Sequence, residues 1–171
     1  MDAIEAIMTR RSIRKYTRDA VSDELIKKLL EAAMSAPSAG NQQAWRFVVI
    51  TERSILDEIP KYHPYSKMLK EAQLAILICG DLEIETRKGF WIQDCAAATE
   101  NILISANALG LGAVWLGVYP REERVAGIKK VLGLPDHIIP VSLIPIGHPA
   151  ESLSPSNRFD KSKVHYNGWS Q

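Results

Sequence analysis

The feature of this sequence that most constrains its fold is a continuous apolar run, Leu74-Ala-Ile-Leu-Ile-Cys79, closed by Gly80. A strand with one face in water alternates apolar and polar residues, whereas a short run that is apolar throughout is typical of a central strand. We therefore expect a sheet whose middle strand lies at 74–79 and whose two faces are both covered by other elements.

Helices and further strands are expected around this run. Apolar spacing and capping residues predict a short N-terminal helix up to Met8 and helices over 22–36, 53–60, 88–109 and 121–132. The remaining strands are expected at 45–51, 113–118 and 138–146. Pro140 and Pro145 interrupt the last of these, which favours either an edge position or a β-bulge. The helix over 88–109 is apolar around a wide arc, so it lies either in the core or at a subunit interface.

The pattern predicts a single α+β domain over residues 1–171. This length is enough for one core, and the chain has neither an internal repeat nor a linker-like segment. The tail after Gly147 is polar, but it also carries four large apolar residues. These residues are Phe159, Val164, Tyr166 and Trp169. Two interpretations stay open, namely a disordered tail and a tail that docks on another surface such as a second subunit.

Composition and charge exclude several classes of protein. The formal net charge is +1, which gives no overall field for nucleic acid or for an anionic membrane. The N-terminus lacks the features of a secretory signal, and no apolar stretch is long enough to span a bilayer. Cys79 and Cys95 lie in apolar surroundings outside any Cys-x-x-Cys pair, so we expect buried, reduced thiols and a cytoplasmic protein.

The first candidate site is a basic segment after the N-terminal helix. Arg10, Arg11, Ser12 and Arg14 combine forked guanidinium donors with a short hydroxyl donor, a set that suits a phosphate or the anionic edge of a ring. A solvated basic turn is the alternative interpretation. The four residues therefore indicate a local anion site only if a second feature supports them.

The second candidate is the loop Ala36-Pro-Ser-Ala-Gly-Asn-Gln-Gln-Ala-Trp45. Ser38, Asn41, Gln42 and Gln43 supply neutral donors and acceptors of the kind that an uncharged heterocycle requires. The alternative is a turn whose side chains bond to its own backbone.

The third candidate is the glycine-rich segment 110–117. Gly110 and Gly112 follow a helix and precede a strand, the reverse of a dinucleotide-binding fingerprint, so we interpret them as a helix cap and a turn. Gly117, at the end of a strand, permits a flat ligand to approach the backbone closely.

Side chains that could perform chemistry themselves are not grouped in the sequence. The four histidines are scattered without metal-ligand spacing, and Asp94 and Glu100 are placed on different sides of their helix. Neither a P-loop nor a Ser-His-Asp arrangement is present. An anion site, an amide-rich loop and a glycine-ended strand without a protein nucleophile are typical of a protein whose chemistry belongs to an organic cofactor.

Together, these motifs resemble the nitroreductase family in their order and spacing over nearly the whole chain. The motifs that carry the resemblance are Arg10-Arg-Ser-Ile-Arg-Lys-Tyr16, Ala36 to Trp45, Gly110 to Gly117, and Gly147-His-Pro149 with Arg158. The resemblance implies a mixed central sheet flanked by helices and an intertwined homodimer with FMN at its interface. It also implies that NADH or NADPH delivers hydride to the flavin N5 and that a small electron-poor acceptor, such as a nitroaromatic or a quinone, then uses the same site.

The resemblance also assigns roles to residues. It implies that Arg10, Ser12 and Arg158 hold the FMN phosphate, while Arg11 and Arg14 lie along the ribityl chain and the pyrimidine edge. Leu116 and Gly117 would lie beside the ring. Lys67 matches a position near the pyrimidine edge, but we favour the alternative interpretation of an exposed lysine. The other subunit would contribute the loop residues Pro37, Ser38, Asn41 and, as a weaker candidate, Gln43.

Two departures from the family bear on these expectations. Ser156 stands where many relatives carry a basic residue, and the short link Gly80–Arg87 replaces larger insertions over the site. A more open pocket leaves the acceptor undefined. Other readings therefore stay open, namely another flavin chemistry on the same fold (dehalogenation, enone reduction or flavin breakdown) and a flavin-binding module without turnover. Nucleic-acid binding is disfavoured by the near-neutral charge.

Overall fold

A computed structural model describes residues 1–169 of the chain. Its helices are α1 (Ala3–Thr9), α2 (Asp23–Met34), α3 (Arg53–Glu58), α4 (Trp91–Ala108) and α5 (Glu122–Leu132). Its strands are β1 (Trp45–Ile50), β2 (Leu74–Asp81), β3 (Gly112–Ala113), β4 (Leu116–Gly117) and β5 (Ile138–Gly147). Short 3₁₀ turns lie at Ala39–Asn41, Ile59–Lys61, Lys67–Lys70 and Lys161–Lys163.

The expected elements are present, with differences at their ends. Ser22 caps α2 by accepting the N–H of Leu25, and Gly133 ends α5 in the left-handed conformation at φ 62°. The long helix begins at Trp91, later than the expected start at Lys88. The strand expected over 113–118 is divided into two short strands, β3 and β4.

The sheet has the strand order β1-β2-β5-β3, and β4 also pairs with β5. All pairs of named strands are antiparallel, and a parallel bridge between Ser12 and Ala113 makes the sheet mixed at its edge. The apolar run occupies β2, which lies between β1 and β5 and is buried along its whole length. The expectation of an interior strand is therefore confirmed.

The position of β5 corrects one expectation and confirms its alternative. The strand lies inside the sheet, so the edge position suggested by its prolines is wrong. The bulge is present, because the pairing with β2 shifts between Ile78 and Cys79 and leaves one extra residue on β5. Pro145 lies opposite the interval between β3 and β4, and its carbonyl accepts the Tyr16 hydroxyl at 3.3 Å. The missing N–H of this proline therefore removes no bond to those strands.

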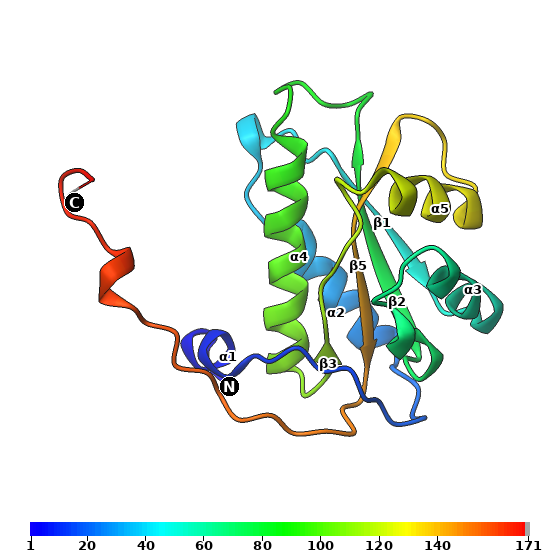
Figure 1. The fold of residues 1–171 in the computed structure, drawn as a ribbon, viewed down its shortest axis with the longest axis horizontal. Helices are drawn as coiled ribbons and strands as arrows, with labels where there is room; N and C mark the ends of the chain where they lie inside the picture. The colour runs from blue at the N-terminus through cyan, green and yellow to red at the C-terminus, as the bar shows by residue number, and fades with distance from the viewer. Residues whose placement is uncertain (170–171) are drawn as a thin grey trace.

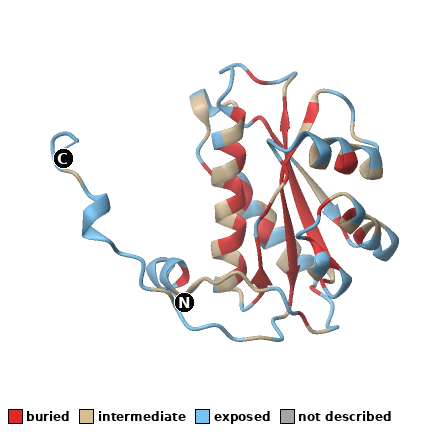
Figure 2. Ribbon diagram, in the orientation of Figure 1, coloured by how far each residue is buried: buried red, intermediate tan, exposed pale blue. Residues whose placement is uncertain are grey.

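The alternation of side chains along β2 produces two cores, one on each face of the sheet. Helices α2 and α4 cover one face, and α3 and α5 cover the other, as Figure 1 shows. Figure 2 shows the buried residues concentrated along the strands and the inner sides of these helices. The β2 residues divide between the cores as Leu74, Ile76 and Ile78 on the α4 side and Ala75, Leu77 and Cys79 on the α5 side.

The C-terminal tail leaves the body of the molecule past α1 (Figure 1). Phe159, Tyr166 and Trp169 are at least 80% exposed there, and Trp169 stacks on His165. Docking of the tail on a second subunit stays a prediction. Within residues 1–169, none of the helices combines the length and the hydropathy needed to cross a membrane.

Candidate functional site

The basic segment runs from the end of α1 along the edge of the sheet. Arg10 follows the last turn of α1, and Ile13 donates its N–H to the Ala113 carbonyl of β3 at 3.0 Å. Farther along, Glu151 accepts the backbone N–H groups of Arg14 and Lys15 at 2.6 and 3.2 Å. The backbone thus holds the segment in place, so its side chains are not needed for that purpose.

The cationic side chains of this segment serve two different hollows. Arg10 and Arg11 line a small hollow of about 190 Å³ beside the end of α4, where Asn107 also lies. Arg10 Nε lies 3.5 Å from a Glu100 carboxylate oxygen, so its charge is partly matched. Arg14 is exposed and lines a second hollow of about 650 Å³.

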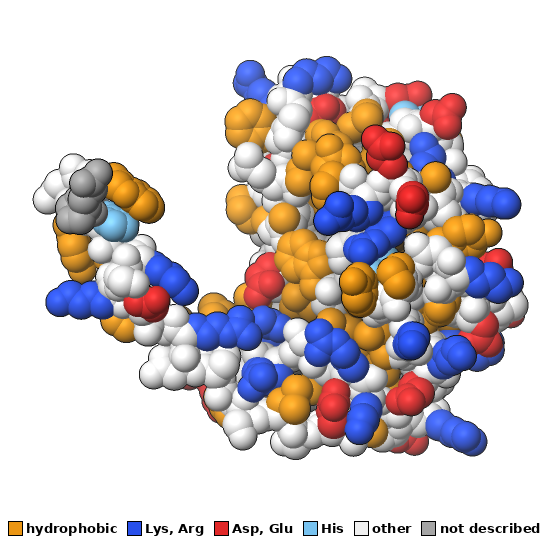
Figure 3. Space-filling model, viewed as in Figure 1, with side chains coloured by type: hydrophobic (Ala, Val, Ile, Leu, Met, Phe, Trp, Pro, Cys, Tyr) orange, Lys and Arg blue, Asp and Glu red, His pale blue; other side chains and the backbone are white. Residues whose placement is uncertain are grey.

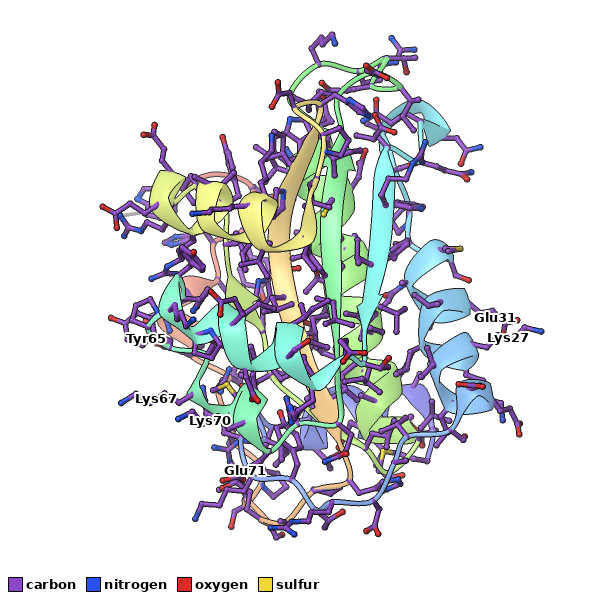
Figure 4. The ribbon with its side chains drawn as sticks, turned by 90° about the vertical axis from the view of Figure 1, so that its right-hand side faces the viewer. Lys27, Glu31, Tyr65, Lys67, Lys70 and Glu71 are labelled. Carbon is purple, nitrogen blue, oxygen red and sulfur yellow. The ribbon has the colours of Figure 1, made fainter. Side chains whose placement is uncertain are left out.

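This larger hollow combines positive charge with apolar walls. Arg14, Lys67 and Arg124 contribute three cations, Trp115 and Leu116 contribute apolar surface, and no carboxylate of the described residues lines it. Figure 4 shows Tyr65 and Lys67 on the same side of the molecule, both projecting from the segment between α3 and β2. Basic and hydrophobic side chains are also interleaved on the face seen in Figure 3. A flat ligand with an anionic edge suits such walls.

Gly117 supplies open space at this hollow, and its backbone groups face away from β5. A Cβ added at Gly117 would meet no atom within 4 Å. The next residue, Val118, donates its N–H to Val141 of β5 at 3.0 Å, and adjacent pairs of an antiparallel ladder alternate between bonded and non-bonded. The N–H and C=O of Gly117 therefore point away from β5, towards the free edge.

The Gly117 carbonyl is held by two side chains that the sequence did not mark. His63 Nε2 lies 3.0 Å from this oxygen and Arg124 Nη1 donates to it at 2.8 Å. Because a carbonyl oxygen only accepts, the His63 Nε2 carries a proton and donates. His63 is 1% exposed. Burial is the largest effect on its pKa and lowers it, whereas the hydrogen bond to the Gly117 carbonyl partly opposes this change.

The amide-rich loop is a turn stabilised by hydrogen bonds between its own residues. The Ser38 hydroxyl accepts the Gln43 N–H at 3.0 Å, and Asn41 Oδ1 accepts the Gln43 side-chain amide at 2.8 Å. Gly40, Asn41 and Gln43 adopt positive φ angles of 56°, 54° and 49°. Glycine and asparagine tolerate this conformation, whereas a glutamine there is uncommon.

Two residues anchor the loop to the body of the molecule, namely Asp94, which was not selected as a functional candidate, and Gln42, which was selected as part of the loop. Asp94, buried in the first turn of α4, accepts the Ala39 N–H at 3.0 Å and the Gln42 side-chain amide at 2.7 Å. Gln42 in turn accepts the N–H groups of Thr86 and Arg87 through its Oε1. Asp94 is thus a structural acceptor rather than a partner of Glu100.

The loop and the basic segment lie at opposite ends of α4 (Figure 1). Asp94 holds the loop at one end, and Asn107 donates to the Ala6 carbonyl and the Thr9 hydroxyl at the other. At 1.5 Å per residue, these two contacts are about 20 Å apart along the helix. A single chain therefore does not bring Ser38 and Asn41 to Arg10 and Ser12.

Arg158 is also not brought to the basic segment within the chain. Its side chain is exposed and forms neither a hydrogen bond nor an ion pair with residues 1–169. The lining of the small hollow includes Leu153 but does not reach Arg158.

The cysteines and histidines can be compared with their expected states. Cys79 and Cys95 are free and buried, and burial raises the pKa of Cys79 to about 12 and that of Cys95 further. Asp81, Glu83 and His137 bring possible ligand atoms within 4.8 Å of one another, a grouping that sequence spacing did not indicate. Arg46 already pairs with Asp81 at 2.9 Å, however, so this cluster contains its own cation.

Comparison with known proteins places the chain among related sequences and structures. A model of the nitroreductase family matches residues 7–67 and 57–148. A Methanothermobacter thermautotrophicus protein provisionally named NADH dehydrogenase/NAD(P)H nitroreductase is 50% identical over 99% of this chain and 88% of its own length.

Two solved structures share the fold over nearly their whole length. An FMN-dependent nitroreductase from Clostridium difficile has a TM-score of 0.90 and is 32% identical, covering 97% of this chain and 99% of that one. A nitroreductase from Desulfovibrio desulfuricans in complex with FMN has a TM-score of 0.85 and is 33% identical, covering 99% of each chain.

Proposed function

The chain belongs to the nitroreductase family, and on that premise we propose that it is an FMN-dependent oxidoreductase. It takes hydride from NADH or NADPH and passes it to a small electron-poor acceptor such as a nitroaromatic or a quinone, both using one site. The observation that carries this proposal is the larger hollow, where three cations and apolar walls surround the open space over Gly117. The relatives named as FMN-dependent or FMN-bound support the choice of cofactor.

The residues at this hollow fit the ring of FMN. Leu116 and the bare backbone of Gly117 permit close approach of the ring, and the free N–H of Gly117 is a donor for one of its acceptor atoms. Arg14 and Lys67 would face the pyrimidine edge, where positive charge favours a reduced, anionic flavin. Arg11 would lie along the ribityl chain, and Arg10 and Ser12 would hold the phosphate.

We propose that a second copy of the chain completes the site. Pro37, Ser38, Asn41 and Gln43 belong to a loop about 20 Å from the basic segment of the same chain, so they would reach the FMN bound by the partner. The exposed tail supports the same arrangement, because docking on the other subunit would bury its aromatic residues and carry Arg158 towards a phosphate. The protein would then be a homodimer with two shared sites.

The side chains of this chain bind and orient rather than react. FMN supplies the two-electron chemistry when bound. The apolar walls formed by Trp115 and Leu116 would cover part of the ring, and the cations would stabilise negative charge on it. Since the described site contains no side chain placed as a nucleophile, no catalytic residue is assigned. The buried, reduced thiols of Cys79 and Cys95 are consistent with work in the cytoplasm.

Spectroscopy of the purified protein tests the proposal. We expect a yellow protein with the FMN spectrum, bleached by NADH or NADPH without oxygen and recovered on adding a quinone or a nitroaromatic. A colourless protein that takes up no added FMN would refute the cofactor, and bleaching without recovery would indicate a binding module without turnover.

Substitution of the phosphate-binding arginine tests the site. Arg10→Ala should weaken FMN binding by about 1–3 kcal/mol, because a charged hydrogen bond is lost. Arg18→Ala is the matched control, since Arg18 is exposed and lies outside both hollows. Equal FMN affinity of the two variants would contradict the phosphate assignment.

A further inference from the structure

We propose that His63 and Arg124 are positioning residues that clamp the Gly117 carbonyl and thereby favour the reduced form of the bound flavin. The inference rests on the proposed function, because it concerns the cofactor assigned to the hollow at Gly117. It gives a role to His63, and it adds to the general role of Arg124 as a cation of the hollow a specific one at the Gly117 carbonyl.

The peptide group after Gly117 is held in one orientation by its neighbours. A glycine has no side chain to fix its peptide groups, and open space surrounds this one on the side of the hollow. The N–H of the peptide that follows is held by Val141 at 3.0 Å, and its carbonyl is held by His63 and Arg124 at 3.0 and 2.8 Å. Both ends of this peptide are therefore fixed, so the carbonyl oxygen keeps its orientation when a ligand binds over Gly117.

The two donors also change the charge that the Gly117 carbonyl presents to a ligand. A carbonyl oxygen carries partial negative charge, which would repel a reduced, anionic flavin at the same edge. Two donors, one of them a cation, offset that charge before the ligand arrives, and dipoles fixed in advance need no rearrangement when charge develops. The clamp thus acts on the reduced flavin more than on the oxidised one.

Neighbouring residues hold His63 and Arg124 in place. The Ser66 hydroxyl donates to the His63 carbonyl at 2.7 Å, and the Arg124 guanidinium lies 5.4 Å from the centre of the Tyr65 ring. His63 Nδ1 is buried without a hydrogen-bond partner among the described residues. A second proton on this ring would therefore be buried unpaired and close to Arg124, so the ring stays neutral with its single proton on Nε2.

The test compares bound FMN in variants of each donor. His63→Leu removes a neutral donor, and His63→Gln can restore one through its amide. Arg124→Met removes a donor with its charge, and Arg124→Lys keeps the charge. For each variant, the midpoint potential and the dissociation constant of oxidised FMN are measured, with His137→Gln as a control because His137 lies outside the hollow.

The clamp predicts a graded result. His63→Leu should lower the preference for reduced over oxidised FMN up to about tenfold, equivalent to a potential lower by about 30 mV for a two-electron couple. His63→Gln should recover most of this shift, and Arg124→Met should lower the potential at least as far. Oxidised FMN should bind His63→Leu and His63→Gln with nearly the wild-type affinity, so that a shift in these variants belongs to the reduced form.

Three results would overturn the clamp or locate the failure elsewhere. Unchanged potentials in His63→Leu and Arg124→Met, with FMN bound, would refute it. A shift in the Arg124 variants alone would assign the effect to charge rather than to the carbonyl. If His63→Leu does not fold, His63→Gln and the two Arg124 variants decide. Failure of the wild-type protein to bind FMN would refute the proposed function instead.

Discussion

At the scale of single residues, burial controls which groups ionise. Cys79 and Cys95 belong to the two separate cores, on either side of the sheet, and each is 0% exposed. Burial disfavours a thiolate, which raises the pKa of Cys79 to about 12. Because an unfolded chain ionises its thiols near the usual value of about 8.5, the two states bind different numbers of protons above that pH.

The raised pKa of Cys79 predicts a specific loss of stability in alkali. The folded pKa lies above the unfolded one, so the contribution is complete below about pH 8.5 and is lost as the pH rises towards 12. Between pH 7.5 and 9.5 the wild-type protein should lose about 1.4 kcal/mol more than Cys79→Ala in urea unfolding. Parallel pH profiles for the two proteins would contradict this.

Single residues also mark the limit of what the sequence predicts. Arg14 and Gly117 were selected by motif, whereas Lys67 only matched a family position and was interpreted as an exposed lysine; all three line one hollow. His63 and Arg124 were not selected, because their roles depend on a turn and a helix that meet at the Gly117 carbonyl only in the folded chain. No local spacing encodes such a contact.

At the scale of elements, apolar periodicity predicted where strands and helices occur but not how they are ordered. The prolines of β5 suggested an edge, yet the strand is interior, because a bulge and the interval between β3 and β4 accommodate them. The loop over 36–43 was predicted as polar, but its dependence on Asp94 was not, since that contact spans 55 residues.

The loop's dependence on Asp94 gives a prediction for an element. Asp94→Ala removes the acceptor of two hydrogen bonds in a buried position, which should lower the free energy of unfolding by about 1–3 kcal/mol. FMN binding should weaken as well, because the loop would no longer hold Ser38 and Asn41. Asp57→Ala, at an exposed carboxylate on α3, serves as the control. Wild-type FMN affinity in Asp94→Ala would exclude the loop from the site.

The contact between α5 and the turn at Tyr62 gives a second prediction at the scale of elements. A Cβ at Gly127 would overlap Cβ and Cγ of Tyr62, one residue before His63. Alanine normally stabilises a helix by about 1 kcal/mol over glycine, but here the overlap should cost about 1–3 kcal/mol instead. Thermal unfolding of Gly127→Ala therefore shows whether the substitution stabilises or destabilises the protein. Ala126→Gly on the same helix serves as the reference for helix propensity. A stabilised Gly127→Ala would show that the turn does not pack against α5.

At the scale of the whole molecule, the fold separates two motifs that a shared cofactor would join. Helix α4 places the amide-rich loop and the basic segment at its opposite ends (Figure 1). The sequence contains both motifs but no measure of the distance between them, so residue patterns alone did not require a second subunit. The proposal of a second subunit rests on the length of α4, together with the family resemblance.

A hybrid dimer tests whether each site is shared between two copies of the chain. Arg10→Ala removes one half of the site, and a Ser38→Ala/Asn41→Ala variant removes the other, so each homodimer should lose FMN. Co-expression of the two variants with different tags should yield hybrid dimers in which one site carries both defects and the other carries neither. We expect up to one tightly bound FMN per hybrid dimer, measured by absorbance after double affinity purification. Hybrids as poor in FMN as both homodimers would contradict a site shared between two copies.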